Sequence, residues 1–187
     1  KQAGLNIGVL SSLIQAGALS SKGDNRSLMV LEAQAFNLLT EREKRNFITL
    51  GEKYDYKLLN AIADAKKGDL VGDGGKPLMK ESRFNTFKKK YDPYKTIYDK
   101  NKKYEKFANW YFETQLLGYS HSTRLNKVFP EQTEALNDSI YYNSMFENDS
   151  ARFIGVVEDA FKRTSRNGNK YIKITVADEV GRYDAML

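Results

Sequence analysis

The residue types that most often do chemistry are sparse in this chain, and they form no recognisable catalytic set. The sequence has one histidine, His121, and no cysteine, so a multi-histidine or thiolate metal site cannot be built. No known motif places a serine or an acid beside His121 as in a catalytic triad. The pairs Asp69/Asp73 and Glu179/Asp184 lack a phosphate-cradling glycine loop with its lysine. We therefore expect no catalytic residue, metal or cofactor in this chain.

The cationic residues are better candidates for function, because they are concentrated in one window. The net charge is +6 over 187 residues. Residues 80–106 contain ten Lys or Arg against four Asp or Glu, so this window alone supplies the whole surplus. Its lysines alternate with phenylalanines and tyrosines. Such a stretch favours a polyanion as partner, although a solvated lysine-rich face is the commoner explanation for a charge run.

The elements that must position these residues are helices first and strands later. Leu5–Leu39 carries two runs of apolar residues at helical spacing, separated by the glycine-containing segment 17–25. Thr40–Glu43 matches a capping box, which predicts a further helix start. Pro93 is expected to interrupt any single long helix in the basic window. Residues 105–118 are predicted to form a helix that stops at its terminal glycine.

From residue 152 the hydrophobic period changes from helical to alternating. Residues 171–176 alternate apolar with polar or aromatic side chains, which is typical of a half-buried strand. Residues 163–170 connect it to a preceding strand, with Asn167-Gly168 as the turn, and a turn at 178–181 leads into a third strand. A three-strand meander of this kind is how an OB-fold barrel begins. It is also how an ordinary meander of another barrel or sandwich is built.

Gly17 stands where the first helical run stops, and the sequence leaves two roles for it. A glycine there can simply end a helix. It can also let backbone N–H groups come close to an anion such as a duplex phosphate.

Three stretches, taken in order, resemble one protein family. They read LNIGVLSSLIQAGALSS…NRSLMVLEA, WYFETQLLGYSHSTRL and FIGVVEDAFKRTSRNGNKYIKITVADEVGRYDAML. They are similar to the region that follows the catalytic core in the alpha subunit of bacterial DNA polymerase III, a family C replicative polymerase. In that family they belong to a helix-hairpin-helix segment, a connecting segment and an OB domain. Residues 40–109 have no counterpart in the resemblance, and the second stretch lacks the family's Gly-His-Pro.

The resemblance, added to the periodicities, implies an α+β architecture. Residues 1–68 are expected to be a helical region with a helix-hairpin-helix motif. Residues 69–150 are expected to be a helical or irregular basic, aromatic-rich linker with a helix near 105–118. Residues 151–187 are expected to be the beginning of a truncated OB-fold β-barrel. Because the chain begins at Lys1 without an initiator methionine and stops inside a strand-like run, we expect a fragment of a larger protein.

DNA is the partner that the resemblance implies, with the hairpin gripping duplex backbone and the barrel taking single-stranded template. The predicted contacts are hairpin amides, lysines of the basic window, and cations or a ring of the barrel: Gly17, Ala18, Leu19, Lys22, Lys88, Lys89, Lys90, Lys102, Lys103, Lys162, Arg163, Arg166, Lys170, Tyr171 and Lys173. No catalytic residue is carried over, because the polymerase's catalytic carboxylates, and the magnesium it would use, lie outside this chain. Gln34–Leu38 and Tyr142–Phe146 loosely resemble the family's sliding-clamp peptide.

Two other functions stay open from the sequence. One is a stand-alone nucleic-acid-binding accessory module, for instance one that binds RNA. The other is a protein-interaction scaffold that docks through a stripe of Phe107, Trp110, Tyr111 and Leu117. No apolar run approaches the length of a membrane span, and the first residues lack the order of a signal peptide. The absence of cysteine is compatible with a reducing compartment, so we expect a cytoplasmic protein without a membrane partner.

Overall fold

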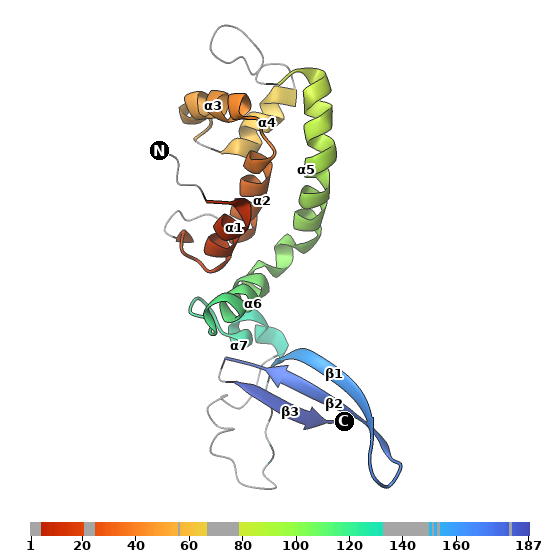
Figure 1. Cartoon of the computed structure of the whole chain (residues 1–187). Coiled ribbons are helices and arrows are strands. Elements are labelled where there is room, and N and C mark those ends of the chain that lie inside the picture. The colour runs from red at the N-terminus through yellow and green to blue at the C-terminus, as the bar shows by residue number, and fades with distance from the viewer. Residues whose placement is uncertain are drawn as a thin grey trace. The chain divides into compact units, whose positions relative to one another are not determined.

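The computed structural model describes residues 5–20, 25–55, 57–66, 79–132, 150, 152, 154–179 and 181–187. The architecture is α+β, as predicted, with helices followed by a three-stranded antiparallel sheet (Figure 1). The chain divides into two compact units, Lys1–Glu105 and Lys106–Leu187. This division falls within the segment 69–150, which the sequence reading treats as one linker.

The first unit is helical. Its elements are α1 (Ile7–Gln15), α2 (Arg26–Asn37), α3 (Glu41–Leu50), the 3-10 turn η2 (Gly51–Tyr54), α4 (Leu58–Lys66), α5 (Glu81–Asn101) and the 3-10 turn η3 (Lys102–Tyr104). The capping box predicted before α3 is confirmed. The Glu43 carboxylate accepts the Thr40 N–H at 2.7 Å, and the Thr40 hydroxyl accepts the Glu43 N–H at 3.3 Å. Two of the N–H groups left unpaired at the helix start are thereby satisfied.

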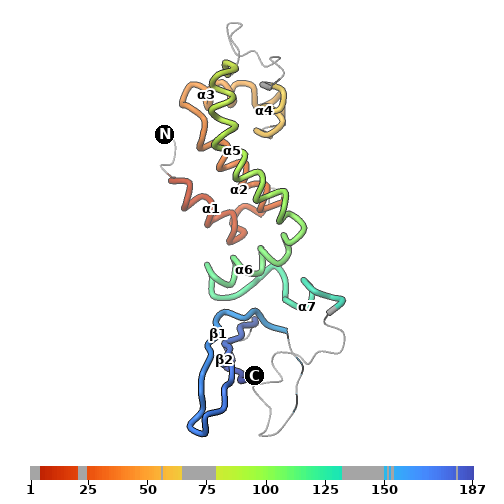
Figure 2. The backbone as a smooth tube through the Cα atoms, turned by 90° about the vertical axis from the view of Figure 1, so that its right-hand side faces the viewer, coloured from red at the N-terminus to blue at the C-terminus, as the bar shows by residue number. Residues whose placement is uncertain are grey.

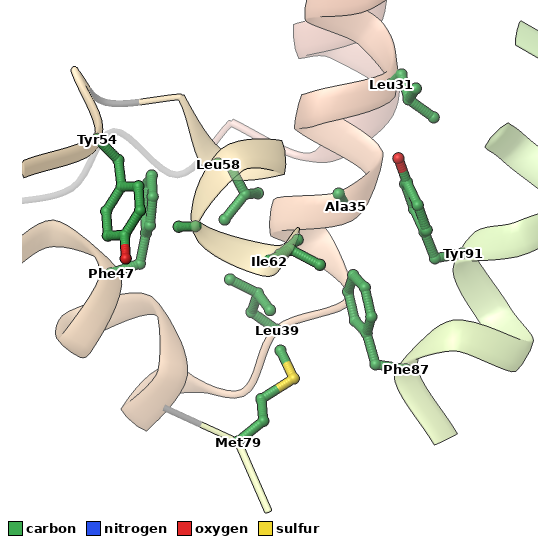
Figure 3. Packing of buried hydrophobic residues seen from close by; sticks show 11 residues of the cluster. Leu31, Ala35, Leu39, Phe47, Tyr54, Leu58, Ile62, Met79, Phe87 and Tyr91 are labelled. Atoms are coloured by element: carbon green, nitrogen blue, oxygen red, sulfur yellow. The ribbon is translucent and has the colours of Figure 1, made fainter. Parts of the chain in front are cut away.

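The core of the first unit gathers side chains from α2, α3, α4 and α5 (Figure 3). Its buried members are Leu31, Ala35, Leu39, Phe47, Tyr54, Leu58, Ala61, Ile62, Met79, Phe87 and Tyr91. Phe87 and Tyr91 stack with their ring centroids 5.4 Å apart. They anchor α5 beside α2, and both views show the two helices side by side (Figures 1 and 2).

Helix α5 continues through Pro93, so the predicted interruption is wrong. Proline lacks the N–H that would bond to the carbonyl of Lys89, four residues earlier. Both residues are exposed, so water can donate a hydrogen bond to the unpaired carbonyl of Lys89. Phe87 and Tyr91 are buried before the proline and Tyr98 packs on the same core after it. Tertiary packing on both sides of Pro93 therefore overrides the local preference for a break.

The second unit combines short helices with the sheet. Its elements are α6 (Glu105–Leu117), α7 (Leu125–Val128), the 3-10 turn η4 (Pro130–Gln132), β1 (Val156–Thr164), β2 (Lys170–Ala177) and β3 (Arg182–Met186). Helix α6 covers the predicted range. It is followed by Gly118, which has φ +83° and donates its N–H to the Thr114 carbonyl at 3.0 Å.

The sheet has the order β1-β2-β3, and its register decides which side chains share a face. Arg163 lies opposite Tyr171, and Phe161 lies opposite Lys173. Directly opposed residues of an antiparallel pair project to the same face, so these four form one cationic and aromatic face. The register shifts between Val157 and Asp159, which marks a β-bulge in β1.

Candidate nucleic-acid interface

The hairpin between α1 and α2 is closed by hydrogen bonds from the residues that were predicted to hold a phosphate. The N–H of Gly17 donates to the Ile14 carbonyl at 2.9 Å, and the N–H of Ala18 donates to the Leu13 carbonyl at 3.0 Å. With φ +85° at Gly17, this is a Schellman motif, in which the last helical carbonyls are satisfied by the two residues beyond the cap. The expected amide-to-phosphate contact is thus wrong for Gly17 and Ala18, because both donors are already used.

The missing side chain of Gly17 makes room for Arg26. A Cβ at Gly17 would lie 2.5 Å from a guanidinium nitrogen of Arg26, and the Arg26 Nη1 donates to the Gln15 carbonyl at 3.3 Å. Asn25 caps α2 by accepting the Leu28 N–H at 2.8 Å. The Asn-Arg pair of the first resembling stretch therefore starts one helix and covers the end of the other.

Leu19 and Lys22 are the two other residues of this hairpin that were predicted to contact DNA. Leu19 is half-buried in the turn that follows Gly17. Lys22 lies outside the described residues.

A buried carboxylate holds the loop that follows α6, within the second resembling stretch. The Glu113 side chain is fully buried. Its Oε2 accepts the Ser120 hydroxyl at 2.9 Å, the His121 N–H at 2.8 Å and the Ser122 N–H at 2.9 Å. Its Oε1 lies 3.4 Å from Nε2 of His121. A buried charge is tolerated when it is surrounded by donors in this way, so Glu113 fixes the path of residues 118–122.

The turn between β2 and β3 is held similarly, within the third resembling stretch. The Asp178 carboxylate accepts the Gly181 N–H at 3.0 Å, and the Asp178 N–H donates to the Gly181 carbonyl at 3.0 Å. The neighbouring Glu179 carboxylate accepts the N–H of Leu125, the first residue of α7. Each of the three resembling stretches therefore contains polar side chains that close a turn or a helix end.

The β1–β2 hairpin ends in a tight turn that was correctly predicted at Asn167-Gly168. Gly168 has φ +80° and donates its N–H to the Ser165 carbonyl at 3.0 Å. The Ser165 N–H donates to the Asn169 carbonyl at 2.8 Å, while the Ser165 hydroxyl accepts the Asn169 N–H at 3.1 Å. A type I turn followed by a left-handed glycine is a standard hairpin connection. It fixes the position of Arg166 at the tip.

The hairpin carries cations without compensating acids. Residues 160–177 contain five Lys or Arg and no Asp or Glu. Four of them, Lys162, Arg163, Arg166 and Lys170, are exposed, and within the described ranges none forms an ion pair. The Arg163 guanidinium lies 5.6 Å from the centroid of the exposed Phe161 ring. By the strand register, Arg163 shares one face with the Phe161 ring, which sequence reasoning missed, whereas Lys162 and Lys170 project to the other face.

Tyr171 and Lys173 are the other sheet residues predicted to contact DNA, and they differ in exposure and in ion pairing. Tyr171 is half-buried on the face it shares with Arg163. The Lys173 Nζ lies 2.6 Å from Asp184 Oδ2. Hydrogen bonds from Lys173, and then from the Thr175 hydroxyl, lower the pKa of Asp184. Lys173 therefore presents less net charge to an anion than the four hairpin cations do.

The lysine triplet of α5 and the two lysines of the following turn η3 differ in whether they have partners. Lys88, Lys89 and Lys90 are exposed and have no carboxylate partner among the described residues. Lys102, in contrast, lies 3.9 Å from Asp99, and the Lys103 ammonium lies over the Tyr104 ring at 4.7 Å. The basic window is thus a helix with a free lysine triplet, followed by the turn η3, whose two lysines already have partners.

The predicted docking stripe is largely used inside the second unit. Trp110 is 1% exposed, and its ring stacks on Phe107 with centroids 6.1 Å apart. Phe107 also contacts Phe129 at 5.7 Å. Tyr111 and Leu117 stay exposed, but the largest member of the stripe is unavailable to a partner.

The acidic pairs considered for magnesium have other surroundings. Asp69 and Asp73 lie outside the described residues. Glu179 accepts a backbone N–H and Asp184 pairs with Lys173. Within the described ranges, no group of three or more His, Cys, Asp or Glu is placed to hold a metal ion. The clamp-like segment Tyr142–Phe146 is also outside those ranges, and Gln34–Leu38 lies in and directly after α2 with Ala35 in the core.

Comparisons with protein-family models, with curated proteins and with solved structures give no match to this chain. No helix among the described residues is both long enough and apolar enough to cross a membrane.

Proposed function

We propose that this chain is a DNA-holding segment of a family C replicative DNA polymerase. Polymerisation, with its magnesium ions, belongs to another part of the parent protein. In this proposal α1 and α2 form the helix-hairpin-helix element, and β1, β2 and β3 are the opening strands of an OB barrel. The partner is DNA, with single-stranded template on the sheet and duplex backbone held by other cations.

The observation that carries this proposal is the β1–β2 hairpin. It presents four exposed cations that have no ion-pair partner in the described structure, and one of them, Arg163, shares a face with exposed Phe161. Proteins that bind single strands combine cations that follow the phosphates with rings on which bases stack. Three hydrogen bonds close the turn at the tip of this hairpin, which reduces the ordering needed when a strand binds.

The resemblance supports the same proposal through its three ordered stretches. In each stretch the distinctive polar residues, namely Arg26, Glu113 and Asp178, make contacts that close a local structure. The duplex grip cannot use the amides of Gly17 and Ala18, so we assign it to side-chain cations instead. We do not propose a clamp contact, because Gln34–Leu38 contributes to the core.

The experiment that tests the proposal is a salt titration of single-stranded DNA binding, read by fluorescence anisotropy with the full chain. The test variant replaces Lys162, Arg163, Arg166 and Lys170 by glutamine. If all four contact phosphates, the slope of log affinity against log salt loses about 2.8 in magnitude, at roughly 0.7 per contact. Binding that is insensitive to salt, or unchanged in this variant, contradicts the proposal.

A matched control removes the same number of charges from cations that already have partners. It replaces Lys44, Lys57 and Lys95, which form ion pairs with Glu41, Asp55 and Asp99, together with Lys53, which lies over the Tyr54 ring. The control should keep most of the wild-type slope. An equal loss in the control would show that only the overall net charge matters.

A further inference from the structure

The lysine triplet of α5 is arranged around the helix in a way that distinguishes among polyanions. Successive residues of an α-helix are about 100° apart around the axis. Lys88, Lys89 and Lys90 therefore fan over about 200°. They follow directly after Phe87 and precede Tyr91, and these two rings bury the opposite side of the helix in the core. Lys89 thus lies opposite the packed face, and Lys88 and Lys90 lie on its two flanks.

The triplet keeps its charge where two later lysines do not, one on the same helix and one in the 3-10 turn after it. Lys95 forms an ion pair with Asp99 four residues later, and Lys102 lies near the same carboxylate. Asp92 has the same four-residue spacing from Lys88, yet no ion pair joins them in the described structure. All three triplet side chains are exposed. The solvent arc of α5 therefore carries three uncompensated charges at one level of the helix.

We infer that α5 lies lengthwise in the major groove of duplex DNA, with Lys88 and Lys90 contacting the phosphates of the two opposite strands. This inference rests on the proposed function for the class of partner. An α-helix with its side chains is about 10–12 Å wide and the major groove is about 12 Å wide, so cations on both flanks reach both backbones. A single strand offers one backbone and engages one flank. Lys89 and the exposed Lys100, eleven residues later on nearly the same side, face the groove floor.

The test compares duplex and single-stranded oligonucleotides of equal length, with the full chain and anisotropy measured over a series of potassium chloride concentrations. The variants are Lys88→Gln, Lys90→Gln and the double variant. For duplex DNA each single substitution should lower the slope by about 0.9, and the double substitution by about 1.8. For single strands the double variant should lose at most about 0.7. The matched control is Lys44→Gln with Lys57→Gln, which removes two paired charges from the same unit.

The outcomes separate this inference from the proposed function. Unchanged duplex binding in Lys88→Gln and Lys90→Gln overturns the groove placement. Equal losses for duplex and single strand also overturn it, because one flank would then be sufficient. If either of these results is found while the β1–β2 hairpin variant still loses single-strand binding, the groove placement fails and the proposed function is kept. If neither hairpin nor α5 substitutions alter DNA binding, the proposed function fails as well.

Discussion

Replacing Glu113 by glutamine tests whether a buried carboxylate holds the second unit together. Three donors converge on Oε2 at 2.8–2.9 Å. Hydrogen bonds to a charged acceptor contribute about 1.5–3 kcal/mol each, against about 0.5–1.5 kcal/mol for neutral pairs. Glutamine keeps one acceptor oxygen but loses the charge, so each bond weakens by about 1 kcal/mol. We expect the free energy of unfolding of this unit to fall by about 3 kcal/mol.

The chain contains its own reporter for this measurement. Trp110 is the only tryptophan, is buried, and lies one helical turn before Glu113. Urea unfolding followed by tryptophan emission therefore reports on the second unit, and far-ultraviolet circular dichroism follows the helices of both units. With an m-value near 1–1.5 kcal/mol/M, the emission midpoint of Glu113→Gln should move down by about 2 M or more.

The matched control is Glu131→Gln, which changes the same group at an exposed position of the same unit. Its free energy of unfolding should stay within about 0.5 kcal/mol of wild type. An unmoved midpoint in Glu113→Gln would refute the reasoning, because three buried donors would then have lost a charged acceptor without consequence. An equal shift in Glu131→Gln would show that the effect is one of net charge.

Three other predictions concern single side chains. Gly17→Ala should destabilise the first unit by more than the about 1–2 kcal/mol of a left-handed alanine, because its Cβ displaces the Arg26 guanidinium from its hydrogen bond to the Gln15 carbonyl. Gly168→Ala, with φ +80° and open space, should show the backbone cost alone in urea unfolding of the second unit. Burial raises the pKa of Tyr91 to about 12, so its contribution to the free energy of unfolding is fully present below pH 10 and should decline by up to about 2.7 kcal/mol as the pH rises to 12. Tyr91→Phe should remove this decline in unfolding followed by circular dichroism, and an unchanged decline would assign it to other groups. Tyr171→Ala should weaken single-strand binding by about 1–3 kcal/mol in the anisotropy assay. Tyr119→Ala, which changes an exposed tyrosine outside the sheet, should bind like wild type. Equal affinities for the wild type and both variants would exclude stacking at Tyr171.

The parts of the fold that the sequence predicts correctly depend on local hydrogen bonding. Thr40 and Glu43 are three residues apart, and their reciprocal bonds need no distant partner. The turn at Asn167-Gly168 follows from the left-handed conformation that glycine accepts readily. Both patterns carry their whole cause within a few residues, so they are visible before any tertiary structure is known.

The parts that sequence reasoning misses depend on contacts across the fold. Pro93 was expected to break α5, but packing of Phe87 and Tyr98 on one core holds the helix through it. Gly17 was predicted to contact a phosphate, because its proximity to Arg26 becomes visible only when α1 and α2 are folded together. Glu113 carries no signal beyond an acidic residue on a helix, and only its burial reveals its role.

The extra residue in β1 has a mechanical consequence for the sheet. A bulge strengthens the right-handed coiling of its strand, and sheets need such local bending before they can curl into a closed cylinder. The irregularity between Val157 and Asp159 lies near the start of β1, far from the hairpin tip. The sheet is therefore bent near the start of β1, whereas beyond the bulge β1 and β2 keep a regular register as far as the hairpin tip.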